Sequence, residues 1–384
     1  MSRRRLLLPT LLLTASLFQA GCSGSKDSGG TGVVSVQLVD GPIGGFQEVN
    51  VHILSVEIAS GGGWITLGHP DRTYNLLALT GGLSETLASG ATLPEGHYSQ
   101  MRLVLGSGNT VKLADGSVQD LFVPSGLQSG LKLITSFDVV AGTTKDVWID
   151  FDAAHSIQIT HTGASDKYLL RPTLRAYDKV ATGAVRGTLT EAGTGAPLAG
   201  ATVYAEVLDG TGEPALARST FTDAQGAYVL DLLPVGATYH IVSQPKVGTG
   251  TVKGYDAQVS PGLALSSGTA LQTWSAAFTA NAALGTVTGT LTPVATDAQS
   301  DLVQLRQSLT PAGGTAGTFI VDSAMAQVGT ATETYSLGNL PAGGYTLRGL
   351  RRTLNPDGSV TFTKTPASPA TVAGGATATV NLVF

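Results

Sequence analysis

Apolar and polar residues alternate with a period of two along much of this chain. The runs at 33–38, 49–53, 147–151, 203–207 and 378–384 all follow this pattern. Successive side chains of a strand point to opposite faces of its sheet, so the pattern predicts strands with one buried face. Asp-Gly turns recur between such runs, at 40–41, 115–116, 209–210 and 357–358. Many short strands joined by turns predict an all-β fold of antiparallel sandwiches or barrels.

Helix is expected to be scarce. Only 13% of the residues are charged, which does not favour long, salt-bridged helices. The segment 82–88 is the best candidate for a turn or two of helix. Within 49–58 the alternation slips by one residue after Ile53, and such a slip predicts a β-bulge.

The N-terminus has the features of an export signal. Three arginines at 3–5 precede an apolar run at 6–18, and small residues lie just before Cys22, the only cysteine. This run is too short to span a bilayer core, which needs about 20 residues. Residues 1–21 resemble a lipoprotein signal peptide, which implies that Cys22 becomes the first residue and carries acyl chains. An ordinary secretory signal with an incidental cysteine, or a twin-arginine signal, remain alternatives.

Residues 22–32 then form the lipidated cysteine and a Ser/Gly tether, which would span about 18 Å. Ser23 stands where lipoproteins retained in the inner membrane of well-studied bacteria have Asp, and this resemblance favours the outer membrane. The membrane is therefore the expected partner, through the N-terminal lipid. Removal of residues 1–21 leaves a net charge of 19 − 27 = −8, which argues against nucleic acid as a partner.

Two sequence segments recur and indicate where domains begin. The segment 185–189 (VRGTL) returns as 287–291 (VTGTL). A Leu-Pro-x-Gly segment followed by tyrosine occurs at 93–98, 233–239 and 340–345. Proline and glycine suit a tight turn, and the tyrosine opens the next strand. A repeat near 100 residues matches one β-sandwich each, with boundaries at about 180 and 283.

Residues 33–178 resemble a family of bacterial lipoprotein domains, the domain of unknown function 4382. The resemblance is carried by the segments 34–42, 48–58, 93–105, 123–133, 149–157 and 167–176. Residues 183–281 resemble a carboxypeptidase regulatory-like domain, through 185–189, 195–203 and 222–228. That resemblance implies a prealbumin-like sandwich, related to immunoglobulin-like and carbohydrate-binding-like folds, with a structural or accessory role. Residues 285–384 resemble a divergent copy of it.

Motifs of catalysis are absent from the sequence. There is no Gly-x-Ser-x-Gly elbow, His-Glu-x-x-His pair or Walker A loop. We therefore expect a cell-envelope lipoprotein that acts as a non-enzymatic structural or binding module on an envelope polysaccharide or protein. One alternative is a carbohydrate-binding surface protein that uses its prealbumin-like domains. Another is an envelope hydrolase with a site in the first domain.

Two groups of side chains are candidate binding sites. Asp146, Asp150 and Asp152 project from one face of a predicted strand, where carboxylates could share a Ca²⁺ ion, although a solvated outer face followed by a turn is the favoured explanation. Trp148 lies on the same side of this strand as the aspartates. Trp148 and Tyr204, which is expected to point outward from its own strand, could stack on sugar rings. Packing in a sandwich core is the alternative for both aromatic residues. No cofactor other than Ca²⁺ is expected, and no catalytic residue is assigned.

Overall fold

The computed structural model describes most of the chain after residue 28. The described residues are 29–40, 46–79, 83–113, 115–123, 130–151, 156–162, 165–171, 174–178, 182–248, 251–266, 271–296, 299–329, 332–355 and 360–384. They are mostly strand, with one 3-10 helix, η1 (Leu76–Leu79), so the predicted all-β sandwich class is confirmed. The predicted helical turn at 82–88 is wrong, because residues from Glu85 onward pair as a strand. The predicted signal peptide, Cys22 and most of the predicted tether lie outside the described residues.

The first domain contains the strands up to residue 178. They are β1 (Thr31–Val39), β2 (Phe46–Ser60), β3 (Gly63–Gly68), β4 (Arg72–Asn75), β5 (Glu85–Pro94), β6 (Gly96–Leu105), β7 (Thr110–Leu113), β8 (Val118–Phe122), β9 (Leu131–Val139), β10 (Thr144–Asp150), β11 (Ile157–Thr162), β12 (Ser165–Leu170) and β13 (Arg175–Asp178). None of the helices in the described part of the chain has the length and apolar character that a membrane span requires.

The core of the first domain lies between two sheets. One has the order β13-β10-β1-β5, and the other includes β8-β7-β2-β6-β9. Val36 of β1 and Val51 of β2 belong to the buried cluster between them. The sheets are mixed rather than purely antiparallel, since β1 pairs with β5 antiparallel but with β10 parallel. The predicted bulge is confirmed by a register shift between Ile53 and Ser55 where β2 pairs with β6.

The second and third domains divide the remaining strands. The second contains β14 (Thr182–Glu191), β15 (Thr202–Leu208), β16 (Pro214–Phe221), β17 (Ala227–Pro234), β18 (Thr238–Ser243), β19 (Lys246–Val247), β20 (Lys253–Tyr255), β21 (Gln258–Val259), β22 (Leu263–Ala264), β23 (Leu271–Thr273), β24 (Ala276–Phe278) and β25 (Ala280–Asn281). The third contains β26 (Leu284–Thr292), β27 (Gln299–Leu309), β28 (Gly317–Met325), β29 (Gln327–Val328), β30 (Glu333–Pro341), β31 (Gly343–Leu354), β32 (Val360–Lys364), β33 (Ser368–Val372), β34 (Thr377–Thr379) and β35 (Leu382–Val383).

The third domain repeats the strand pairing of the second. Strand β14 pairs antiparallel with β17 and parallel with β23 and β24. Strand β26 pairs in the same way with β30, β34 and β35. In the facing sheets, β15 lies between β16 and β18, and β27 lies between β28 and β31. The VxGTL segments lie within the equivalent strands β14 and β26, so the sequence repeat marks a structural repeat.

The three Leu-Pro-x-Gly segments share one hydrogen bond. The tyrosine hydroxyl that follows each segment donates to the carbonyl oxygen of the same proline. The distances are 2.9 Å for Tyr98 to Pro94, 2.7 Å for Tyr239 to Pro234 and 2.8 Å for Tyr345 to Pro341. All three tyrosines are buried. This bond ties the beginning of one strand to the end of the strand before it. In every domain the two strands belong to different sheets, so the recurring segment fixes a corner between sheets and does not form a hairpin.

The glycine of the VxGTL segment is required by close backbone packing. A Cβ atom placed on Gly187 would lie 1.7 Å from the carbonyl oxygen of Trp274. That same oxygen accepts a 2.7 Å hydrogen bond from the Tyr228 hydroxyl. Because the backbones of β14 and the segment between β23 and β24 approach so closely, only glycine fits there.

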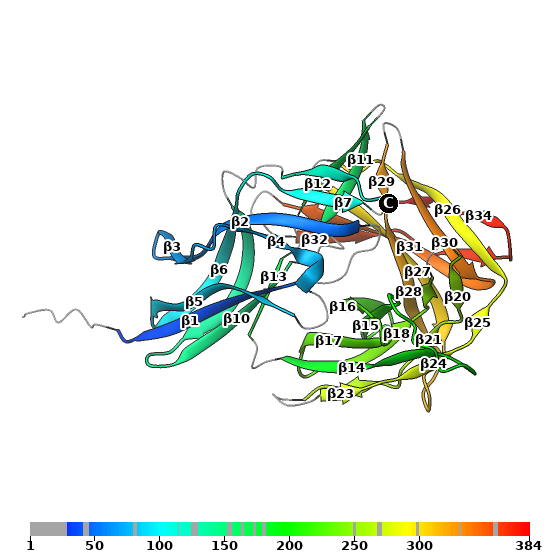
Figure 1. The fold of residues 1–384 in the computed structure, drawn as a ribbon, viewed down its shortest axis with the longest axis horizontal. Helices are drawn as coiled ribbons and strands as arrows, with labels where there is room; N and C mark the ends of the chain where they lie inside the picture. The colour runs from blue at the N-terminus through cyan, green and yellow to red at the C-terminus, as the bar shows by residue number, and fades with distance from the viewer. Residues whose placement is uncertain are drawn as a thin grey trace, which may run out of the picture.

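The packing of the domains buries both faces of one sheet (Figure 1). The sheet β16-β15-β18-β21 of the second domain contributes Val203 and Ile241 to that domain's own core. Tyr204 and Val242, on its other face, belong to the core of the third domain. Strand β11 of the first domain pairs in parallel with β29 of the third through Thr160 and Val328. Described strands of these two domains therefore form one continuous fourteen-stranded sheet.

The glycine of the third-domain repeat gives a direct test of this packing. A Cβ on Gly289 would lie 1.7 Å from the carbonyl oxygen of Val380, whereas one on Gly344 would meet nothing within 4 Å. We expect Gly289→Ala to lower the free energy of unfolding by about 1–3 kcal/mol through overpacking. The control Gly344→Ala should change it far less. Urea unfolding of both variants checks this, and equal losses would contradict the proposed role of the repeat.

Candidate functional site

A cavity of about 280 Å³ lies where the three domains meet. Its walls come from β10 and β13 of the first domain, β16 of the second, and β27, β31 and β32 of the third. The charged residues that line it are Asp150, Arg175, Arg218, Arg306, Arg352 and Lys364. Sites between domains are common places for ligands, and this one combines apolar walls with convergent charges. We therefore take it as the candidate site.

A buried ion pair joins the first two domains at this cavity. The Arg218 guanidinium on β16 lies 2.8 Å from the Asp150 carboxylate on β10, and both side chains are less than 10% exposed. Arg175 on β13 donates to the carbonyl oxygen of Ala217 at 3.4 Å. Removing one partner of a buried pair leaves an uncompensated charge, so the contact holds the two domains in one relative position.

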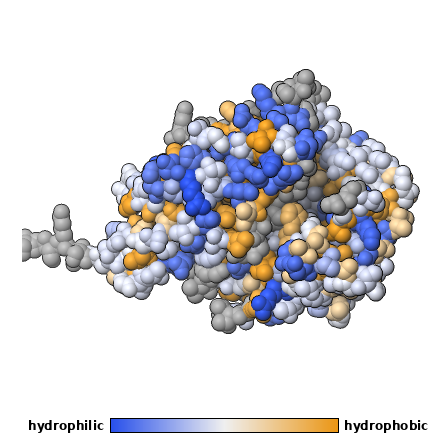
Figure 2. Space-filling view, in the orientation of Figure 1, coloured by the Kyte–Doolittle hydropathy of each residue, from blue (hydrophilic) through white to orange (hydrophobic). Residues whose placement is uncertain are grey.

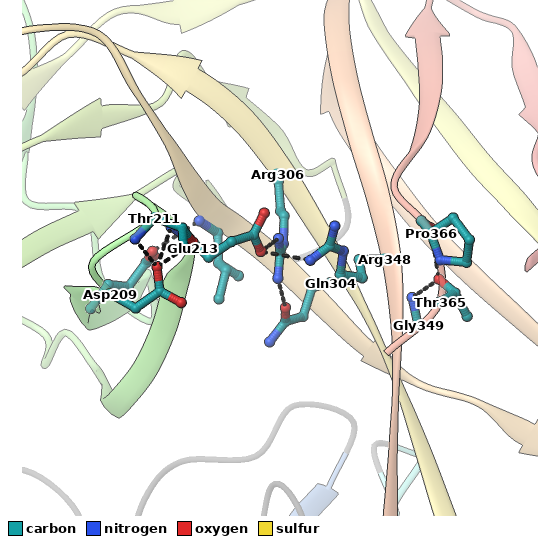
Figure 3. A network of polar contacts seen from close by, with 11 residues as sticks. Asp209, Thr211, Glu213, Gln304, Arg306, Arg348, Gly349, Thr365 and Pro366 are labelled. Carbon is teal, nitrogen blue, oxygen red and sulfur yellow. Dashed lines mark hydrogen bonds and ion pairs between the residues drawn. The ribbon is translucent and has the colours of Figure 1, made fainter. Parts of the chain in front are cut away.

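A second set of charges joins the second and third domains (Figure 3). Glu213, at the end of the β15–β16 hairpin, accepts hydrogen bonds from Arg306 at 2.8 Å and from Arg348 at 2.7 Å. Arg306 also donates to Gln304 at 2.7 Å. Burial tends to raise the pKa of Glu213, but the Arg306 hydrogen bond and the charges of Arg306, Arg348 and Lys364 outweigh it and lower the pKa. Glu213 is therefore held as a carboxylate.

Glu206 is a buried acid whose pKa is raised, whereas the pKa of Glu213 is lowered. It lies on β15, is fully buried, and accepts a 3.0 Å hydrogen bond from the backbone N–H of Ile320 on β28. Burial raises its pKa to about 8, although the Ile320 hydrogen bond and the Arg306 charge act in the other direction. Glu206 is thus a neutral carboxylic acid at pH 7, placed between the sheets of two domains.

Further hydrogen bonds cross the domain boundaries. Gln244 of the second domain donates to the hydroxyl of Tyr345 of the third at 3.0 Å. The ammonium of Lys246 contacts the carboxylate of Asp322. Arg171 of the first domain donates to the carbonyl oxygens of Thr296 and Gln299, at 3.1 and 2.6 Å. Each pair of domains is therefore joined by polar contacts of its own.

Two family models match this chain, in the order that the resemblances in its sequence predicted. Residues 31–172 match the domain of unknown function DUF4382, and residues 184–272 match the carboxypeptidase regulatory-like domain. The chain combines these two domain types. No curated protein matches it.

Several solved structures are similar to this chain at low identity. The Bacillus anthracis TIE protein is 12% identical, with 92% of this chain and 51% of that chain covered and a TM-score of 0.21. This chain therefore spans about half of that protein. A streptococcal ancillary pilin is 12% identical, with 91% and 98% covered and a TM-score of 0.20. The minor pilin of Streptococcus agalactiae is 13% identical, with 52% and 94% covered and a TM-score of 0.19.

The three aspartates of the DUF4382 domain have different surroundings. Asp146 is exposed, Asp150 is buried against Arg218, and Asp152 lies outside the described residues. Asp150 therefore does not lie on the solvated face that was expected, because the regulatory-like domain covers it. Among the residues that the structure describes, no three His, Cys, Asp or Glu side chains come together as a metal site. A Ca²⁺ site that includes Asp152 stays a prediction.

The two candidate aromatic residues also differ. Trp148 is half-buried on β10, opposite Tyr177 of β13, so its contact with a sugar stays a prediction. Tyr204 points away from the core of its own domain, as expected, but it does not reach solvent, since it is only 5% exposed and packs in the core of the third domain. In this fold Tyr204 has no free face on which a sugar could stack. The face in Figure 2 carries apolar side chains as small separate groups among polar ones.

Sequence reasoning missed the residues of the junction, although one signal was present. Glu206 lies on the side of 203–207 opposite Val203, Ala205 and Val207 and therefore gave no signal. Arg306 follows four mostly apolar positions of β27. A charged residue within a strand that is otherwise buried indicates a partner from another element. Which element supplies that partner is set by how the domains pack, and the period of two along a strand does not contain that information.

The Asp150–Arg218 pair can be tested with a double-mutant cycle. We expect Asp150→Asn and Arg218→Met each to cost about 3–5 kcal/mol, because each leaves a buried charge without its partner. The double variant should cost clearly less than the sum, as measured by urea unfolding. The exposed pair Arg72 and Glu85, 3.0 Å apart, is the control and should show about 1 kcal/mol of coupling or less. Additive losses at Asp150 and Arg218 would contradict the pairing.

Glu206 should make stability depend on pH. Its carboxyl keeps a proton up to about pH 8 in the folded chain, whereas in the unfolded chain it loses the proton near pH 4.3. The free energy of unfolding should therefore fall as pH rises from about 5 to about 8. Glu206→Gln should remove this part of the decline while keeping an acceptor for Ile320. Urea unfolding at several pH values checks it, and an equal decline in both proteins would contradict the assignment.

Proposed function

We propose that this chain is a non-enzymatic module of the cell envelope, anchored through acyl chains on Cys22. It presents its three domains as one rigid body. The observation that most supports this proposal is the set of ion pairs between the domains at their junction. One ion pair, of Asp150 with Arg218, crosses the boundary between the first and second domains. Another, of Glu213 with Arg306, crosses the boundary between the second and third, and together these pairs hold the domains in place.

Contacts of this kind are suited to a structural role. A buried ion pair adds little net stability compared with apolar packing, but breaking it is costly and its geometry is narrow. Two domains joined in this way lose freedom of rotation that a flexible linker would leave them. The continuous sheet through β11 and β29 adds backbone hydrogen bonds to the same effect. A rigid body displays its loops at fixed distances, which favours recognition of an extended polymer or a partner protein.

The N-terminal segment supports a position close to the membrane. The described body begins at Gly29, seven residues after Cys22. Seven residues reach at most about 25 Å, from about 3.3–3.6 Å per residue. The lipoprotein character that the resemblance to DUF4382 domains implies agrees with this arrangement. The Ser at position 23 favours the outer membrane.

Labelling with a palmitate analogue tests the anchor. We expect the wild-type chain to incorporate the label and to remain in the membrane fraction, because thioether-linked and amide-linked acyl chains together give stable attachment. Cys22→Ala should incorporate no label, and Ser23→Ala should behave as the wild type. Gel fluorescence of the membrane and soluble fractions measures both.

Two results would contradict the proposal. Equal labelling of Cys22→Ala and the wild type would remove the anchor. Release of soluble fragments from peptidoglycan or polysaccharide by the purified wild-type chain would show that the module is an enzyme.

A further inference from the structure

We propose that the cavity at the domain junction binds a small amphiphilic organic anion, whose carboxylate lies against the basic side chains and whose apolar part lies along the aliphatic wall. This inference goes beyond the anchored scaffold, which needs no ligand.

The charge of the cavity favours an anion. Among the described residues that line it, five are basic (Arg175, Arg218, Arg306, Arg352 and Lys364) and one is acidic (Asp150). Glu213 and Arg348, in the adjoining network, add one charge of each sign. Several of these guanidiniums have protein partners, so the proposal depends on the excess of four positive charges and not on unpaired arginines. A cavity with low-dielectric walls concentrates such a field on its contents.

Two of the basic groups are suited to hold a carboxylate. Arg306 is 2% exposed, and its Nε atom is buried without a hydrogen-bond acceptor among the described residues. Buried donors usually have an acceptor, so this one indicates a missing partner. Lys364 is exposed on β32 at the cavity and forms no ion pair within the described part of the chain. An ammonium at the rim attracts an anion without being fixed beforehand.

The remaining walls favour an apolar body of limited size. Leu216, Leu302, Met325, Leu350 and Phe362 line the cavity. Phe362 is 53% exposed and lines the cavity, so a ligand there would cover part of its ring. The volume of about 280 Å³ is close to the lower end of small-molecule sites. A short fatty or aromatic carboxylate fits these apolar walls together with the basic groups, and Ser219, Ser300 and Gln304 supply further hydrogen-bonding groups beside them.

Isothermal titration of the mature chain, residues 22–384 with Cys22→Ser, tests the proposal with simple probes. Octanoate is the anionic amphiphile, octanol has the same chain without charge, and octylammonium has the opposite charge. Glucuronate and inorganic phosphate are anions without an apolar body. We expect saturable binding of octanoate, at least about tenfold weaker binding of octanol, and no binding of octylammonium.

Variants at the rim locate the site without disturbing the buried network. Lys364→Gln should weaken octanoate binding about fivefold by removing a charge that faces the ligand. Phe362→Ser should also weaken it. Lys132→Gln, an exposed lysine of β9 that does not line the cavity, is the matched control and should bind as the wild type does. Circular dichroism and the urea midpoint confirm that each variant folds.

Three results would overturn the proposal. The first is the absence of saturable octanoate binding to the folded wild-type chain. The second is equal affinity for octanoate and octanol, which would show an apolar site with no role for charge. The third is binding of glucuronate or phosphate without binding of octanoate, which would show an anion site without an apolar part. None of these outcomes bears on the labelling of Cys22, so the two proposals fail separately.

Discussion

The inner sheet of the regulatory-like domain, built around β15 and β18, has two apolar faces and must be covered on both. Ala205 and Ile241 fill the core of their own sandwich, and Tyr204 and Val242 on the opposite face fill that of the third domain. A sheet of this kind cannot stand at the surface of a separate domain, because one apolar face would remain in water. The third domain supplies the cover, and the relative position of the two sandwiches follows from it.

Burial of this second face has consequences for the polar groups that share it. Glu206 is neutral because its surroundings raise the pKa of the carboxyl, and its hydrogen bond to Ile320 links the two sheets. Glu213 lies nearer the edge, where two arginines keep it charged. Two glutamates seven residues apart thus have opposite charge states in one interface. The difference comes from whether a basic group or an apolar sheet lies opposite each of them.

The local structure could be predicted from the sequence to a large extent. The period of two located strands such as β1, β2 and β10, and the Leu-Pro-x-Gly segments located turns between consecutive strands, whose tyrosines all bond to the preceding proline. That these turns join two sheets and do not form hairpins was not predicted. The slip after Ile53 correctly indicated a bulge. These features depend on neighbours along the chain or on one partner strand.

The site could not be predicted in this way. Asp150 and Tyr204 each lie on the face of a strand that alternation assigns to solvent, and each is buried by a different domain. Whether a polar face is solvated or paired depends on the packing of whole sandwiches. Arg218, which neutralises Asp150, is 68 residues away in the chain and belongs to another domain. Spacing carries no signal for such a contact.

The contacts at the junction predict that the three domains fold as one unit. Differential scanning calorimetry of the mature chain tests it most directly. A single transition whose calorimetric and van't Hoff enthalpies agree would support one cooperative body. Separate transitions for the DUF4382 domain and the two sandwiches that follow it would contradict the account, since domains joined only by linkers unfold independently.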